Sequence, residues 1–253
     1  FIDHILVFGS VVGERYSRDL KGSVLPMGAI TNNFASKKNS AQPGVIAYVG
    51  MWRLSTGEYF ARNRFFSFED VWTHPDTLVI QCLMHYAREN DKRLKIIPNS
   101  NFSADRLRME KEYFRELMGV EPEYFDASGP YTCYDGVDSA EIVVASESTL
   151  AYESVARHKK TAFFQLRTTL LEMPDLAYGW PGDFPDEGPF WTNKPDPDIF
   201  IRILDYLFEV SDEQWKKDVE STNFSSLIKY DPGNTIFQSI LEKELGLPPT
   251  SIH

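Results

Sequence analysis

Three hydroxyl side chains, Ser146, Ser148 and Thr149, stand in a polar turn between an apolar run and a helical segment. Residues 141–145 predict a buried parallel strand, and residues 150–157 predict one or two turns of helix. At such a turn the main-chain N–H groups are free and the helix dipole is positive, which suits the oxygens of a phosphate. The sequence therefore predicts an anion site at residues 146–149.

The same hydroxyls have a second interpretation, because Ser and Thr are preferred at helix N-caps. Glu153 does not complete a capping box, which from Thr149 would require an acid or amide at Tyr152. The residues alone leave both roles open, the binding of an anion and the ending of a helix.

Three further loops are expected beside this turn, since the carboxyl ends of parallel strands open on one edge of a sheet. They follow strands predicted at residues 45–49, 94–97 and 124–127. Their small, amide and hydroxyl side chains include Asn99, Ser128 and Gly129. Each loop taken singly has ordinary turn composition. Together they favour a nucleotide crevice whose phosphates lie at residues 146–149.

Two residues are weak catalytic candidates. His74 precedes Pro75 at a helix start, where it could contact an anion, although Pro75 also fits an ordinary first turn. Glu187 lies in a long proline-rich loop, residues 168–197, where a carboxylate could act as a base or bind sugar hydroxyls. The cations expected near the predicted edge, any of which could pair with a phosphate, are Arg53, Arg62, Arg64 and Arg167. No Ser-His-Asp spacing, metal-ligand cluster, Walker loop or G-x-G-x-x-G motif occurs.

Composition limits the partners. The 253 residues hold 26 Lys and Arg against 37 Asp and Glu, a net charge of -11, which argues against nucleic acid. The two cysteines are too few for a disulfide framework and favour a reducing compartment. No apolar run is long enough to predict a membrane span.

The chain divides into two predicted regions. Residues 1–40 predict the tail of a preceding domain and a linker, with a strand at residues 4–8 and a glycine-punctuated, loop-rich stretch at residues 9–33. Residues 44–253 alternate strand and helix and predict one Rossmann-like parallel sheet flanked by helices. The start without methionine, inside an expected strand, indicates a piece of a longer polypeptide.

A specific likeness appears at residues 148–153, Ser-Thr-Leu-Ala-Tyr-Glu, and residues 159–164, Lys-Lys-Thr-Ala-Phe-Phe. They resemble the nucleotide-sugar half of GT-B glycosyltransferases from bacterial surface-carbohydrate biosynthesis. Residues 188–193, Gly-Pro-Phe-Trp-Thr-Asn, and residues 230–235, Tyr-Asp-Pro-Gly-Asn-Thr, resemble later signatures of that group. The resemblance implies two facing Rossmann-like domains, of which only the C-terminal one is complete here. The acceptor site and catalytic base are then expected in an N-terminal domain outside this chain.

The resemblance also implies roles for single residues. Ser146, Ser148 and Thr149 would hold phosphate, Ser128 and Gly129 would lie against ribose or base, and Glu153 belongs to the same nucleotide-binding set. Related sialyl- and Kdo-transferases use CMP-sugars and carry His-Pro after the second strand. This chain has Pro98 and Asn99 there, so Asn99 would replace the histidine.

The implied activity is transfer of a sugar from a nucleotide-sugar donor to a glycan or lipid-linked glycan acceptor. The resemblance to sialyl- and Kdo-transferases implies CMP as one candidate for the nucleotide of the donor. No cofactor or metal is implied. The implied location is the cytoplasm, with peripheral contact to the inner membrane through a lipid-linked acceptor. Alternatives are a polyol-phosphate transferase, a nucleotide-sugar epimerase and a non-catalytic scaffold domain of similar fold.

Overall fold

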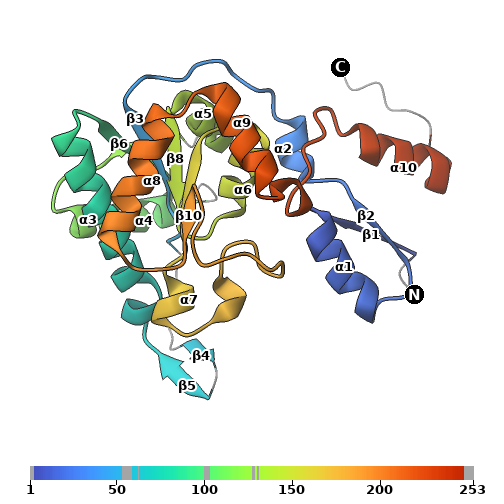
Figure 1. Cartoon of the computed structure of the whole chain (residues 1–253), viewed down its shortest axis with the longest axis horizontal. Helices are drawn as coiled ribbons and strands as arrows, with labels where there is room; N and C mark the ends of the chain where they lie inside the picture. The colour runs from blue at the N-terminus through green and yellow to red at the C-terminus, as the bar shows by residue number, and fades with distance from the viewer. Residues whose placement is uncertain are drawn as a thin grey trace.

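A six-stranded parallel sheet forms the centre of the protein (Figure 1). The computed structural model describes residues 3–52, 59–61, 63–99, 103–126, 129 and 131–247. The strands are β3 (Val45–Val49), β6 (Arg93–Ile97), β7 (Glu123–Tyr124), β8 (Ile142–Ala145), β9 (Thr161–Phe164) and β10 (Trp191–Thr192). Their spatial order is β10-β9-β8-β3-β6-β7 and every neighbouring pair is parallel. This is the order of a doubly wound Rossmann sheet, so the predicted α/β fold is confirmed.

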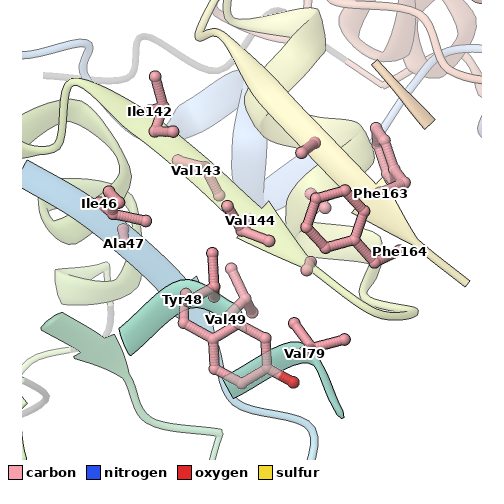
Figure 2. Packing of buried hydrophobic residues seen from close by; sticks show 14 of the residues in the cluster. Ile46, Ala47, Tyr48, Val49, Val79, Ile142, Val143, Val144, Phe163 and Phe164 are labelled. Carbon is pink, nitrogen blue, oxygen red and sulfur yellow. The ribbon is translucent and has the colours of Figure 1, made fainter. Parts of the chain in front are cut away.

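Helices cover both faces of this sheet. α3 (His74–Glu89), α4 (Ala104–Met118) and α8 (Pro197–Glu209) pack together on one face, and α5 (Thr132–Ser139) and α6 (Thr149–Ala156) lie on the other. β3 and β8 are enclosed between the two layers, and Figure 2 shows their side chains in the core. The residues of β8 are 0% exposed, which explains why this strand is apolar without alternation.

A smaller N-terminal unit, residues 4–34, packs beside the large sheet. It contains β1 (His4–Val7), α1 (Ser10–Asp19), β2 (Ser23–Pro26) and α2 (Ile30–Phe34), with β1 and β2 paired in parallel. The prediction of a loop-rich stretch at residues 9–33 is therefore wrong. Gly13 lies inside α1, where an added Cβ would come 3.2 Å from Val24 Cγ1. This glycine serves close packing of the helix on β2, and it does not mark a turn.

After the large sheet the chain returns to the N-terminal unit, and Figure 1 shows its last helix on the same side of the large sheet as β1 and β2. After α9 (Asp212–Ser221), residues 227–234 run along this unit before α10 (Thr235–Leu245). Lys229 N donates to Phe8 O at 2.9 Å, and Asp231 N donates to Asn33 Oδ1 at 2.9 Å. Asp231 also accepts from Ile236 N at 2.7 Å and so caps α10. Asn234 occupies the N-cap position of α10 without a side-chain capping hydrogen bond, and it donates its side-chain amide to Ile30 O.

Two smaller features complete the described structure. The antiparallel hairpin β4 (Tyr59–Ala61) and β5 (Arg64–Phe66) follows β3, and a π-helical turn, Glu69–Thr73, leads into α3. The long loop predicted at residues 168–197 is ordered by α7 (Arg167–Leu170), a 3-10 turn at Pro174–Leu176, and β10. Within the described ranges, every helix is too short or too polar to cross a bilayer.

Candidate functional site

The predicted turn lies at the point where the strand order of the sheet reverses. β3 has β6 on one side and β8 on the other, and the register pairs Val49 with Ala145. Open α/β sheets bind ligands in the crevice at such a reversal, beyond the carboxyl ends of the strands. Ser148 is the N-cap of α6 and accepts from Leu150 N at 3.3 Å, while Thr149 is the exposed first helical residue. The turn is therefore a helix start at a ligand-binding position, and Ser148 has the capping role.

Two neighbouring cavities open between α6 and the N-terminal unit. A cavity of about 410 Å³ includes Phe8, Val12 and Glu153 in its lining, and one of about 150 Å³ includes Phe8, Val12 and Thr149. Because they share Phe8 and Val12, we treat them as one groove, the α6 groove. Its other lining residues are Leu6, Val7, Tyr16, Met27, Gly28, Ala29, Ile30, Thr31, Tyr152, Trp180, Leu227 and Ile228. The carboxyl ends of β1 and β2 thus face the helix that follows β8 across a common groove.

Glu153 brings a buried carboxylate to the wall of this groove. Its residue is 6% exposed, and Tyr134 donates its hydroxyl to Oε2 at 2.6 Å. The Tyr134 oxygen also lies 3.0 Å from Thr31 Oγ1 of the N-terminal unit. Burial raises the pKa of Glu153, and the Tyr134 hydrogen bond and the charge of Arg157 oppose that rise. A carboxylate in this position can accept hydrogen bonds from the hydroxyls of a ribose or another sugar.

Ser146 lies deeper than Ser148 and Thr149 and belongs to a buried polar network. It is 2% exposed, and its Oγ is 3.2 Å from the Tyr48 hydroxyl. Tyr48 donates to Asp76 Oδ1 at 3.0 Å, and Tyr113 donates to Asp76 Oδ2 at 2.8 Å. Ser146 therefore connects the turn to the N-terminal end of α3, whereas Thr149 lines the groove.

Arg167 is the candidate arginine that the fold brings to the turn. Its Nε donates to Glu147 Oε1 at 2.8 Å, and its guanidinium lies 4.2 Å from the centre of the Trp72 ring. The residue is 4% exposed. Arg64 contacts Leu171 O instead, and Arg53 and Arg62 lie outside the described residues. Arg167 thus ties the end of β9 to the loop after β8.

The buried Asp76 carboxyl gives a test of this network through pH. Burial raises the pKa of Asp76, while its hydrogen bond from Tyr113, the charge of Arg167 and its hydrogen bond from Tyr48 lower it. A carboxyl whose pKa is higher in the folded state contributes stability that is fully present below its unfolded pKa, about 3.9. That contribution is lost as the pH rises through the folded pKa. We expect Asp76→Asn, which does not titrate, to gain stability relative to wild type between pH 4 and pH 7.

Urea denaturation at several pH values measures this difference in unfolding free energy. Asp70→Asn is the matched control, because Asp70 is exposed and its hydrogen bonds from Ser67 lower its pKa. Its difference from wild type should change in the opposite direction. A flat difference for Asp76→Asn would show that burial of this carboxylate costs nothing.

The other predicted nucleotide-binding residues are Asn99, Gly129 and Ser128, and in the sequence they follow β6 or precede α5. Asn99 is exposed and donates its side-chain amide to Trp52 O at 3.1 Å, which joins the loops after β6 and β3. Gly129 is half-buried before α5, and its carbonyl accepts from Thr132 Oγ1 at 2.9 Å. Ser128 lies outside the described residues. Whether these residues contact a nucleotide stays a prediction.

The two weak catalytic candidates lie away from the α6 groove. His74 is exposed and lines a separate cavity of about 380 Å³ with Arg64 and Asp70. Glu187 forms ion pairs with Lys194 and, at 3.5 Å, with Arg202, next to the edge strand β10. Both stay candidates without a described contact to the groove.

Several residues of the candidate site were not predicted from sequence. Thr31 and Phe8 precede Glu153 by more than a hundred residues, and no local motif connects them. Tyr134 lies in α5, and a tyrosine within a helix has ordinary packing roles. Asp76 carried a usable signal, since an acid in a first helical turn directly after Pro75 marks a helix N-terminus.

Comparisons with known proteins agree with this arrangement. Residues 1–245 match a family described as "putative O-antigen biosynthesis protein". No curated protein sequence matches the chain significantly.

Among solved structures, the wall teichoic acid polymerase TagF has a similar fold. Its H548A variant has a TM-score of 0.54 at 11% identity, over 96% of this chain and 58% of that chain. The H444N variant soaked with CDPG has a TM-score of 0.52 at 12% identity, over 96% and 57%. This chain therefore spans a little over half of the TagF chains. UDP-GlcNAc 2-epimerase from Neisseria meningitidis, with a TM-score of 0.41 at 13% identity over 82% of this chain and 45% of that chain, is too weakly similar to bear on the fold.

The similarity to TagF confirms the predicted GT-B-like architecture, and it extends over the N-terminal unit as well as the large sheet. The family match covers the same two parts of the chain. The chain belongs to this family of O-antigen biosynthesis proteins.

Proposed function

We propose that this chain is the donor-binding part of a glycosyltransferase that transfers a sugar from a nucleotide-activated donor to a surface-glycan acceptor. One observation carries the proposal: the carboxyl ends of two parallel sheets face one groove, and Thr149 and Glu153 lie on its wall. Membership of an O-antigen biosynthesis family supports a carbohydrate substrate.

In this proposal the donor phosphate binds at the N-terminus of α6. The hydroxyls of Ser148 and Thr149 and the main-chain N–H of Thr149 are the donors for its oxygens, because Leu150 N already donates to Ser148 Oγ and Ala151 N to Ser148 O. The helix dipole adds positive potential. As the bond to the sugar breaks, negative charge grows on the departing phosphate, and fixed donors stabilise it. The chain's acidic net charge gives no general attraction for phosphate, so affinity depends on these local groups.

Glu153 has the complementary task of binding hydroxyl groups of the donor. Its carboxylate faces a mainly apolar groove, where a hydrogen bond to a charged acceptor is strong because water competes little. The base that activates the acceptor hydroxyl is proposed to come from a domain other than the one that holds α6, as the GT-B resemblance implies.

A thermal-shift screen with CMP, CDP, UDP and GDP tests the proposal. A ligand at a hundred times its Kd stabilises the folded state by about 2.7 kcal/mol. For a chain of this size that corresponds to a rise in Tm of roughly 5–10 °C. If none of the four nucleotides raises the Tm, the chain is a non-catalytic relative that has kept the fold.

A polyol-phosphate transferase is the second candidate, favoured by the fold of TagF, a wall teichoic acid polymerase studied with CDPG. Transfer assays with the nucleotide that binds, linked either to a sugar or to a polyol, separate the two activities. Turnover of the sugar-linked donor supports the first proposal, and turnover of the polyol-linked donor alone supports the second.

Removing the charge of Glu153 should weaken donor binding. We expect Glu153→Gln to raise the Kd of the bound nucleotide about tenfold, since hydrogen bonds to charged groups are worth about 1.5–3 kcal/mol. Isothermal titration measures this change, and Glu116→Gln, an exposed position on α4, is the control for the loss of one charge. An unchanged Kd for Glu153→Gln would remove the carboxylate from the site.

A further inference from the structure

The three hydroxyls of the turn differ in what they can donate. In a hydrogen-bond network each hydroxyl has one proton, and an ionised carboxylate only accepts. The hydroxyl protons can be counted along the hydrogen-bonded series from Asp76 through Tyr48 to Ser146. This count shows which hydroxyl is the donor in the contact between Tyr48 and Ser146, which the distance alone does not.

Asp76 lies at the buried end of this hydrogen-bonded series and is 2% exposed. Its Oδ1 accepts from the Tyr48 hydroxyl at 3.0 Å and its Oδ2 accepts from the Tyr113 hydroxyl at 2.8 Å. Tyr48 is 0% exposed and lies in the core on β3 (Figure 2). Its single proton is committed to Asp76, so the 3.2 Å contact with Ser146 can only be a donation from Ser146 Oγ to the Tyr48 oxygen.

The hydroxyl protons of Ser148 and Thr149, unlike that of Ser146, are not assigned to an acceptor in this network. Ser148 Oγ accepts from Leu150 N at 3.3 Å and keeps its own proton for another partner. Thr149 is exposed and lines the smaller cavity of the α6 groove. Thr149 is therefore the hydroxyl of this turn that faces the groove, and Ser148, which is 9% exposed, is a second hydroxyl whose proton is not used in capping α6.

We infer that Tyr48 and Asp76 are positioning residues, which hold the proton of Ser146 inside the protein and fix the turn so that Ser148 and Thr149, and not Ser146, donate to the donor phosphate. This inference rests on the proposed function. It changes the role predicted for Ser146 from a phosphate contact to an anchor of the loop on β3 and α3. The groups that face Asp76 are Tyr48 from β3, Tyr113 from α4 and Arg167 from α7, and their hydrogen bonds and charge oppose the rise in its pKa that burial causes.

The test measures binding of CDP at pH 8 for single and double variants. Ser148→Gly, which keeps a good N-cap, and Thr149→Val each remove a direct donor and should raise the Kd about tenfold. Ser146→Ala and Tyr48→Phe both remove the anchoring hydrogen bond, and Tyr48→Phe also removes the donation from Tyr48 to Asp76. Each should raise the Kd about threefold or more, and the double variant should be no weaker than Tyr48→Phe alone.

Two results would overturn the inference. One is a tenfold loss for Ser146→Ala with wild-type affinity for Tyr48→Phe, which is the pattern of a serine that donates directly to phosphate. The other is an additive loss in the double variant.

A second measurement decides the matter even if wild type binds no CDP, a result that would count against the proposed function alone. In urea denaturation the midpoint should fall for Ser146→Ala and for Tyr48→Phe, and the double variant should fall by less than the sum. Additive shifts would contradict the shared hydrogen bond and with it the inference.

Discussion

Replacing Arg157 by alanine is expected to lower the free energy of unfolding by about 3–5 kcal/mol, the range for breaking a buried ion pair from one side. Arg157 is 0% exposed, and its Nη2 donates to Asp138 Oδ2 at 2.7 Å. The same guanidinium donates to the carbonyls of Ala35 and Ser36 at 3.0 and 3.1 Å. The substitution leaves the buried Asp138 carboxylate without its cationic partner, with Lys38 N as a remaining donor, and it leaves the Ala35 and Ser36 carbonyls without the guanidinium.

Urea denaturation of Arg157→Ala measures this loss, and Arg88→Ala is the matched control. Arg88 also pairs with an acid, Glu89, but its side chain is 73% exposed, so the expected change is below about 1 kcal/mol. The double variant Arg157→Ala with Asp138→Ala should recover part of the loss, because no buried charge is then left unpaired. Equal effects at positions 157 and 88 would show that the buried pair does not hold the linker to the large sheet.

Gly28→Ala is expected to destabilise the protein by about 3 kcal/mol or more. Gly28 follows β2 with φ +78°, and an added Cβ would come 2.0 Å from Lys229 O. A left-handed conformation alone costs an alanine about 1–2 kcal/mol, and the clash with a main-chain carbonyl adds to it. The expected consequence is separation of residues 227–234 from the N-terminal unit, which opens one wall of the α6 groove.

Gly119→Ala separates the two causes. Gly119 has a similar φ of +67°, and nothing lies within 4 Å of an added Cβ there. It should cost about 1–2 kcal/mol from backbone strain alone. Limited proteolysis should cut the N-terminal unit faster in Gly28→Ala and not in Gly119→Ala. Equal destabilisation of the two variants would contradict the close approach of Lys229.

Much of the large sheet could be predicted because its signals are local. The strands predicted at residues 45–49 and 94–97 are found as β3 and β6. The strand, turn and helix at residues 141–157 are found as β8 and α6, since a buried strand needs apolar residues throughout and a helix start needs a cap. The predicted third strand at residues 124–127 is shorter, with β7 at Glu123–Tyr124.

The N-terminal unit could not be predicted in the same way. Gly13 and Gly28 read as turn residues, yet one permits helix packing and the other permits contact with a main-chain segment two hundred residues later. Neither partner is visible from local sequence. The same limit applies to Arg157. It lies at the end of a predicted helix, and the local sequence does not indicate that it is buried and paired with Asp138.

The place of the candidate site in the sheet was predicted from sequence, but the contacts of its residues were predicted only in part. The turn at residues 146–149 lies at the reversal of the sheet, as expected from the alternation of strand and helix. Ser146 contacts Tyr48 of β3, which in turn donates to Asp76 of α3. The burial of Ser146 therefore depends on the order of the strands in the sheet, which a single sequence does not reveal. The contribution of Phe8 and Thr31 to the groove likewise depends on the return of residues 227–234 to the N-terminal unit.

Crystals soaked with CDP give the most direct measurement of the central claim, that the α6 groove binds an activated donor. We expect difference density with the phosphates within hydrogen-bond distance of Ser148 and Thr149, and with the nucleoside in the groove beside Glu153. Density in the cavity lined by Arg64 and His74 instead, with the α6 groove unchanged, would contradict the account.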